Sequence, residues 1–186
     1  TLSPGLRYNT QMHVPDGRDV DPRFGMTWAP FKSGRTSLRA SAGVFHGWFA
    51  MPNYEQMLRF DGVRQQELFV VNPAYPNAAA GGPVPPTSKY ELSPDLALMR
   101  ATRYSAGIDH VVSPKFRLSV LFNHASQVHV LRGRNLNAPQ NNVRPNPLLA
   151  NVIEAVPDAE GGWHFVDVNA TINLAGGVSG VNARAV

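Results

Sequence analysis

Polar and apolar residues alternate along several segments of the chain, and a period of two is typical of β-strands whose two faces meet different environments. Residues 116–124 show it well: Phe116, Leu118 and Val120 alternate with Arg117 and Ser119. The pattern predicts seven strands, at residues 2–12, 23–30, 37–48, 103–111, 116–124, 166–174 and 181–185.

The connections between these segments are alternately short and long. The short ones, 31–35, 113–115 and 175–180, carry the Gly or Pro that tight turns require. The long ones are 13–20, 49–102 and 133–162. In an antiparallel sheet, all the short turns would therefore lie at one end and all the long loops at the other.

Two architectures accommodate such strands. A soluble β-sandwich would bury the apolar positions against a second sheet, with a carbohydrate or other ligand bound by its long loops. A transmembrane β-barrel would expose the same positions to lipid, and several features favour it. The strands are long, and the sequence has only 16% charged residues, below the roughly 25% of an average soluble domain. Aromatic residues also sit near the strand ends, as in the girdles of membrane barrels: Tyr8, Trp28, Trp48, Tyr104 and Phe116.

Other classes are disfavoured by composition. No apolar run approaches the roughly 18 residues of a membrane-spanning helix, and 43% hydrophobic residues are too many for a disordered chain. The net charge is +4, but the basic residues are scattered rather than clustered with aromatics, so no nucleic-acid partner is expected. The chain has no Cys, and none of its Ser residues has a base in a recognisable arrangement, so we expect no enzyme and no catalytic residue.

Two stretches of the chain resemble a known family. Residues 21–31 (DPRFGMTWAPF) and 34–45 (GRTSLRASAGVF) resemble a strand–turn–strand in the barrels of TonB-dependent outer-membrane receptors, above all the Oar-like group with a carboxypeptidase-regulatory-like domain. Residues 5–8 (GLRY) and 132–139 (RGRNLNAP) are similar to further segments of that group.

The resemblance implies a barrel of roughly 22 strands around a plug domain. Such a receptor sits in the outer membrane of a Gram-negative bacterium, contacts its lipid, and passes a ligand inward with energy from the TonB complex. The plug, the TonB box and the terminal aromatic residue expected of the family are absent from these residues. We therefore expect 1–186 to be a partial barrel domain, an internal fragment or a truncated gene product without independent function.

The polar positions of the predicted strands are the first candidate site residues. Their charged members would face the barrel lumen, where the arginines could attract an anionic ligand or pair with acidic groups of the plug or of neighbouring strands. Pairing is the preferred interpretation. The candidates are Arg7, Arg23, Arg39, Arg103, Asp109, Arg117 and Arg184.

The long connection 49–102 is the second candidate, because loops beyond about 12–15 residues are usually functional or disordered. We expect it to fold over the barrel mouth and form part of a ligand vestibule, with the tip at 81–86 needed for capture but not for folding. The ligand stays open among siderophores, vitamins, oligosaccharides and peptides. The candidate residues are Tyr54, Arg59, Arg64, Tyr75 and Tyr90.

No metal or cofactor is expected. Asp16, Asp19 and Asp21 lack the spacing of a calcium loop, and a solvated loop tip is the preferred interpretation. His124 and His129 are five apart, so on a regular strand they would point to opposite faces and could not share a metal ion.

Overall fold

A computed structural model describes residues 1–65, 70, 72–77, 86–174 and 177–186. One helix, α1 (Met51–Arg59), and eight strands make up the described fold. The strands are β1 (Leu2–Asn9), β2 (Asp19–Trp28), β3 (Thr36–His46), β4 (Thr87–Leu92), β5 (Arg100–Ser113), β6 (Phe116–Asn135), β7 (Leu149–Leu174) and β8 (Gly177–Ala185).

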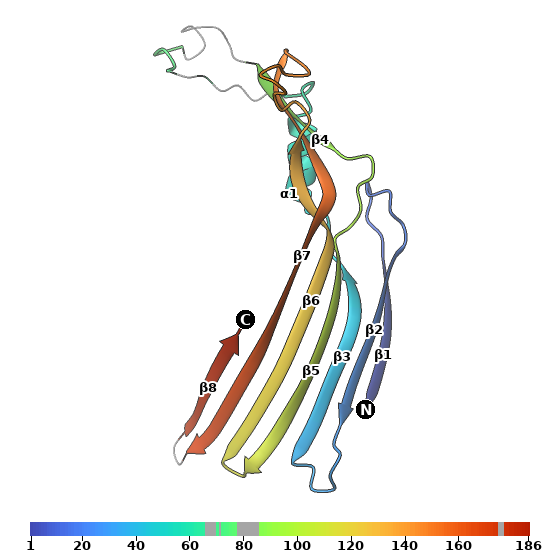
Figure 1. The fold of residues 1–186 in the computed structure, drawn as a ribbon, viewed down its shortest axis with the longest axis vertical. Helices are drawn as coiled ribbons and strands as arrows, with labels where there is room; N and C mark the ends of the chain where they lie inside the picture. Colours follow the sequence, from blue (N-terminus) through green and yellow to red (C-terminus); the bar gives the residue numbers. More distant parts are fainter. Residues whose placement is uncertain (66–69, 71, 78–85, 175–176) are drawn as a thin grey trace.

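All eight strands belong to one sheet (Figure 1). Strands β1, β2, β3, β5, β6, β7 and β8 pair antiparallel, each with the next in this order. The short connections lie at the lower end of the sheet and the long ones at the upper end, as the spacing of the predicted strands requires. The predicted all-β, up-and-down barrel segment is confirmed, although the described strands leave β1 and β8 as unpaired edges rather than closing.

Two long connections hold more structure than the sequence predicts. The predicted loop 133–162 is wrong for most of its length: β6 continues to Asn135 and β7 begins at Leu149, which leaves only residues 136–148 as a connection. The connection 49–102 contains α1 and an eighth strand, β4, that the sequence did not predict. Strand β4 pairs parallel with the upper part of β7, on the edge that β8 occupies lower down.

The connection between β1 and β2 lies earlier in the chain than predicted, at residues 10–18 rather than 13–20. Strand β1 ends at Asn9, and β2 begins at Asp19 rather than Arg23, so Asp19 and Asp21 belong to the wall of the sheet. Pairing of Asn9 with Asp19 and of Arg7 with Asp21 fixes this register.

The described part of the chain has little conventional core. Phe49, Leu96 and Leu98, which lie in the long connection between β3 and β5, form one small buried cluster, and Val14, Tyr54, Leu92 and Leu131 pack around it. No helix in the described ranges is long and apolar enough to cross a membrane.

Candidate functional site

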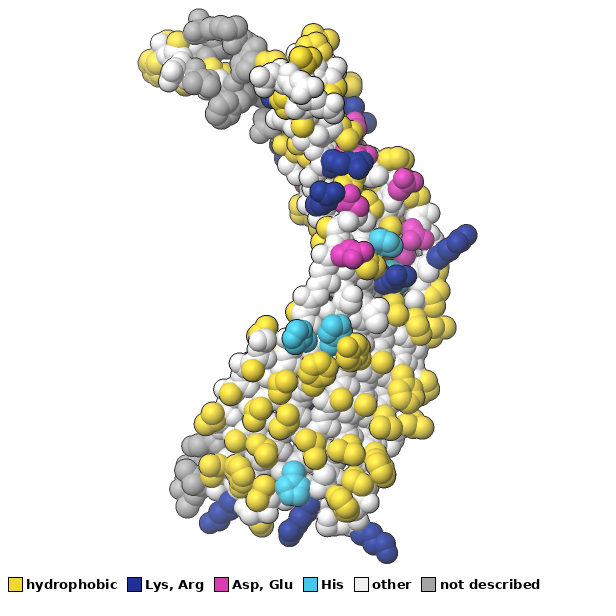
Figure 2. All heavy atoms as spheres, in the orientation of Figure 1, with side chains coloured by type: hydrophobic (Ala, Val, Ile, Leu, Met, Phe, Trp, Pro, Cys, Tyr) yellow, Lys and Arg dark blue, Asp and Glu magenta, His cyan; other side chains and the backbone are white. Residues whose placement is uncertain are grey.

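With the exception of Trp163, the large exposed hydrophobic side chains of the strands share one face of the sheet. The register places Phe24, Ala42, Tyr104 and His124 side by side on adjacent strands, and the other even-numbered positions follow them. Figure 2 shows these apolar side chains as a band, with histidines along its upper border and basic residues below it. The face includes Leu2, Leu6, Tyr8, Phe24, Trp28, Tyr104, Ile108, Val168 and Ile172, all more than a third exposed.

Aromatic rings mark both ends of this face. His124 stacks on Tyr104 with ring centroids 4.6 Å apart, and His164 continues the row at 6.4 Å. Trp28 ends β2 and Phe116 begins β6 at the opposite end of the sheet. Amphipathic rings of this kind suit the interface between hydrocarbon and water. A β-sandwich would have to cover this face, and all the described strands lie in a single sheet that leaves it open.

The opposite face carries the polar positions, and ion pairs join several of its strands. Arg39 of β3 lies 2.6 Å from Asp109 of β5 and also donates to Ser119 of β6. Arg184 of β8 lies 2.7 Å from Asp167 of β7. The structure therefore brings Arg39 and Asp109 together, and it gives Arg184 an acidic neighbour that sequence reasoning did not single out.

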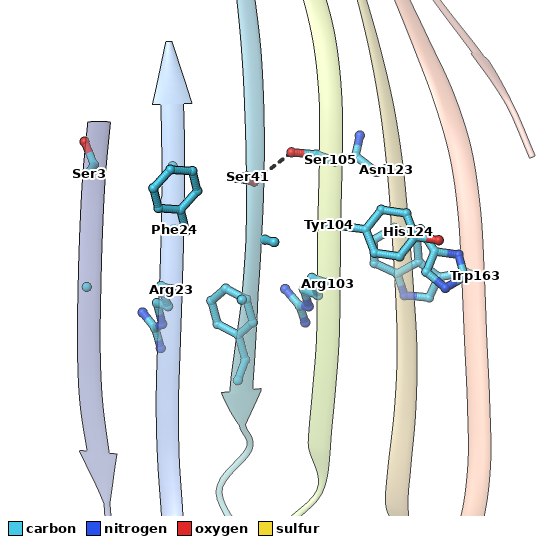
Figure 3. Close-up of a pocket in the computed structure, with 15 residues that line it drawn as sticks. Ser3, Arg23, Phe24, Ser41, Arg103, Tyr104, Ser105, Asn123, His124 and Trp163 are labelled. Carbon is cyan, nitrogen blue, oxygen red and sulfur yellow. Dashed lines mark hydrogen bonds between the residues drawn. The ribbon is translucent and has the colours of Figure 1, made fainter. Parts of the chain in front are cut away.

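The other arginines of this face are arranged differently. Arg23 of β2 and Arg103 of β5 lie on either side of β3 (Figure 3), where their guanidinium carbons are 4.4 and 5.3 Å from the ring centroid of Phe45. Arg23 also pairs with Asp21 at 3.2 Å. Within the described residues, Arg7 and Arg117 form no ion pair.

A buried polar cluster lies at the upper end of β2, where a solvated loop tip was expected. That expectation is wrong for Asp19 and Asp21, which are 1% and 0% exposed, whereas Asp16 lies in the connection before β2 and is partly buried. The ring of His46 lies between the two carboxylates, with Nδ1 2.6 Å from Asp21 and Nε2 3.4 Å from Asp19. The shared period of two in Asp19, Asp21 and Arg23 is the signal that could have placed these acids on the strand.

Asp21 is the centre of this cluster. Its Oδ1 accepts from the backbone N–H of His46 as well as meeting the ring, and its Oδ2 accepts from Asn9 at 2.8 Å and from Arg23 at 3.2 Å. These contacts fix β1, β2 and β3 to one another. The two ring nitrogens of His46 face different carboxylates, so they do not converge on one point, and no group of three metal-binding side chains occurs among the described residues.

We call the antiparallel strands β1–β3 and β5–β8 the wall, and α1 together with β4, at its upper end, the ledge. The predicted ligand-loop residues are spread over the ledge and the chain that follows α1. Tyr54 of α1 stacks on His13 at 4.8 Å. Arg59 lies over the ring of Phe60 at 5.8 Å, and Tyr90 of β4 is 5.9 Å from the same ring. Tyr75 is 98% exposed. The structure thus groups Arg59 with Tyr90 and leaves Tyr54 apart.

Arg64 belongs to a local turn. Asp61 accepts hydrogen bonds from the backbone N–H groups of Arg64 and Val63, which hold the pKa of its carboxyl below the usual value, and the Arg64 side chain lies 3.2 Å from it. The tip at 81–86, which was expected to be needed for capture, lies outside the described residues except for Pro86.

Beyond the wall, β6 and β7 continue as a projecting hairpin (Figure 1). Arg132 makes two hydrogen bonds to Asp158, which hold the pKa of Asp158 below its usual value, and Arg134 lies 2.7 Å from Glu154. At the tip, the amide of Asn137, 1% exposed, bonds the backbone of Asn146 and Leu149. The asparagines of the segment 132–139 therefore close this hairpin, a role that the sequence did not reveal.

Comparison with known proteins decides the family. The model of the outer membrane beta barrel domain matches residues 2–183. The chain belongs to this family. It is consequently a segment of an outer-membrane barrel in a Gram-negative bacterium, as the alternating strands and the resemblance predicted.

Solved structures show the same fold. The chain superposes on the ferric enterobactin receptor PfeA of Pseudomonas aeruginosa with a TM-score of 0.65 and 12% identity, covering 97% of this chain and 24% of that one. The FrpB iron transporter of Neisseria meningitidis gives a TM-score of 0.54 and 16% identity, over 89% of this chain and 18% of that one. No curated protein matches the sequence.

This chain therefore spans about a quarter or less of the receptors it resembles. At the level of fold, the predicted likeness to a barrel segment of TonB-dependent receptors is confirmed. The two solved structures are those of a receptor and a transporter, neither of which is an enzyme.

Proposed function

We propose that this barrel segment is part of a receptor that binds a ligand at the cell surface and passes it into the periplasm. The remaining strands and a plug domain of the same protein would complete it, and the TonB complex would supply energy through regions outside this sequence. Because the two similar structures are a ferric enterobactin receptor and an iron transporter, a ferric chelate is the first ligand class to test.

One observation carries the proposal: the two faces of the sheet suit two different media. One face exposes large apolar side chains from β1 to β8, as a lipid-facing wall does. The other carries arginines, carboxylates and hydroxyls that bond across strands, as in Arg39–Asp109 and the 2.8 Å contact of Ser41 with Ser105. A wall with lipid on one side and a polar interior on the other separates a conduit from the membrane.

The ledge of α1 and β4 supports a surface role for the long connection. It packs on the projecting hairpin at the end of the sheet opposite the short turns. We assign Tyr54, Arg59, Arg64, Tyr75 and Tyr90 to this vestibule as candidates. Tyr75 is the sharpest test, because its side chain is almost fully exposed and its removal disturbs no described packing.

The proposal is tested by deleting the full-length gene and measuring uptake of labelled ferric chelates, vitamins, oligosaccharides and peptides. We expect the deletion to abolish uptake of one ligand class and a protonophore to abolish it equally in the parent strain. Membrane fractionation should recover the protein in the outer membrane with heat-modifiable migration in SDS. Unchanged uptake of every ligand in the deletion strain would refute the receptor function.

Tyr75→Ala in the same full-length protein should weaken ligand capture about threefold to tenfold if this tyrosine contacts the ligand. Val63→Ala is the matched control, because Val63 is 87% exposed on the same long connection. Equal affinities for both variants and the parent would remove Tyr75 from the vestibule.

A further inference from the structure

We propose that Arg23 and Arg103, held on either side of Phe45, form a binding site for an oxyanion, a carboxylate or phosphate group on a diffusible solute. The site lies on the polar face of the wall, where β2, β3 and β5 run side by side (Figure 3). The inference rests on the proposed receptor function and assigns a chemical class to the solute.

The backbone register places both arginines. Arg23 and Arg103 are the direct cross-strand neighbours of Gly43, and Phe45 follows two residues later on the same face of β3. A Cβ at position 43 would lie 3.1 Å from Cε2 of Phe45 and 3.2 Å from Cγ of Arg23, so glycine makes room for this row. A guanidinium whose plane rests on an aromatic ring keeps the N–H donors along its edge free for a ligand.

Arg103 has no compensating charge in the wall. Arg39 and Arg184 each reach a carboxylate of the adjacent strand, whereas the direct neighbours of Arg103 are Gly43 and Ala125. Within the described ranges, its guanidinium makes contact with the ring of Phe45 but no ion pair.

Arg23 is only partly satisfied. Of the four contacts that Asp21 receives, the one from Arg23 is the longest at 3.2 Å, and the Nε of Arg23 is buried without an acceptor among the described residues. Buried N–H groups without a partner are rare in native proteins. Nε itself is covered, so the donors of Arg23 that an external oxyanion can reach are its terminal N–H groups, on a side chain that is 37% exposed.

The arginines open onto a hollow of about 360 Å³, which is in the usual range of small-molecule sites. Ser41, Ser105 and Asn123 supply neutral polar groups, and the lining residues include two arginines and no Asp or Glu. Because the hollow is far larger than one carboxyl group, it fits an oxyanion carried by a small molecule. The fork of N–H donors on each arginine matches the paired oxygens of carboxylate or phosphate.

Binding is measured on the purified full-length receptor by equilibrium dialysis with radiolabelled citrate and with inorganic phosphate. Arg103→Gln should weaken binding of at least one probe about tenfold. Phe45→Leu should weaken binding about threefold, because it removes the ring that positions the two guanidinium groups but keeps both of their charges. Arg7→Gln and Arg117→Gln are the matched controls: each removes one unpaired arginine of the same face outside the hollow, and each should change binding less than about twofold.

Two results would overturn the inference. Equal losses in Arg103→Gln and both controls would mean that the general positive field attracts the probes. No binding of either probe, with a lower unfolding temperature for Arg103→Gln alone, would mean that a carboxylate of the protein itself fills the site. Uptake assays distinguish the failure of this inference from the failure of the receptor function. If ligand uptake requires the gene but is unaffected by Arg103→Gln, the receptor function stands and only the oxyanion site is refuted.

Discussion

At the residue scale, the carboxylate of Asp21 connects the upper ends of three neighbouring strands. It is fully buried and accepts from Asn9, Arg23 and His46, which come from three strands. Sequence reasoning placed Arg23 on a strand but read the acids before it as a loop, because Asp-Val-Asp-Pro has the composition of a turn. The burial of the two acids is explained by His46, which lies 25 positions after Asp21 in the sequence but beside it in the folded sheet.

Asp21→Asn should lower the stability of the full-length barrel by about 2 kcal/mol, since the amide nitrogen would face donors that the carboxylate now satisfies. The measurement is the temperature at which the heat-modifiable band is lost in SDS. Asp16→Asn changes a partly buried acid in the connection before β2 and keeps the side-chain oxygen that accepts from the backbone N–H of Arg18, so it should leave that temperature nearly unchanged. Equal melting of the two variants would contradict the role of Asp21.

At the scale of single elements, the strands that the sequence predicts are those with two unlike faces. Residues 116–124 and 166–174 alternate because one face meets lipid, and both were predicted correctly. The upper part of β7 was missed, because Val152 and Ile153 are adjacent apolar residues and Pro157 and Gly161 resemble loop residues. A hairpin that projects beyond the membrane has no lipid-facing side, so it is free of the alternation on which the prediction depends.

Strand β7 offers neighbouring positions that test the two faces directly. Val168→Arg, on the apolar face, should destabilise the barrel by about 2–4 kcal/mol because the charge would enter hydrocarbon. Asn169→Arg, on the polar face, should cost less than about 1 kcal/mol. Folding into lipid vesicles, followed by the heat-modifiable band, measures both. The opposite order would mean that the faces have been assigned the wrong way round.

The projecting hairpin should loosen in acid. Hydrogen bonds from Arg132 hold the pKa of Asp158 below its ordinary value of 3.8 in the folded state, so the pair stabilises the hairpin above that value and is lost as the pH falls through the lowered pKa. Proteolysis of the hairpin by an acid protease should accelerate as the pH falls below the ordinary aspartate pKa of 3.8. Arg132→Gln should remove most of this pH dependence, and an unchanged profile in that variant would assign the effect to another group.

At the scale of the whole molecule, the family and the antiparallel up-and-down order of the strands follow from the sequence. The closure of the barrel does not. Strands β1 and β8 are both edges in the described sheet, and the chain covers only 24% of the PfeA receptor. Unpaired edges beside an apolar face pair readily with other chains.

Residues 1–186 produced alone should therefore aggregate or form oligomers and give no heat-modifiable band, whereas the full-length protein should give one. Refolding in detergent followed by size-exclusion chromatography and SDS migration measures the difference. A monomeric, heat-modifiable product from 1–186 would show that the sheet closes by itself.

The parallel pairing of β4 with β7 has a consequence for protein engineering. A single edge of β7 holds β8 in the membrane-facing wall and β4 in the surface ledge, so one continuous strand sets the height of the ledge above the wall. A peptide epitope grafted at Leu148, which is 82% exposed at the hairpin tip, would be displayed at a fixed distance from the bacterial surface. The segment is in this sense a display scaffold whose outer end can be altered while its anchoring strands are left untouched.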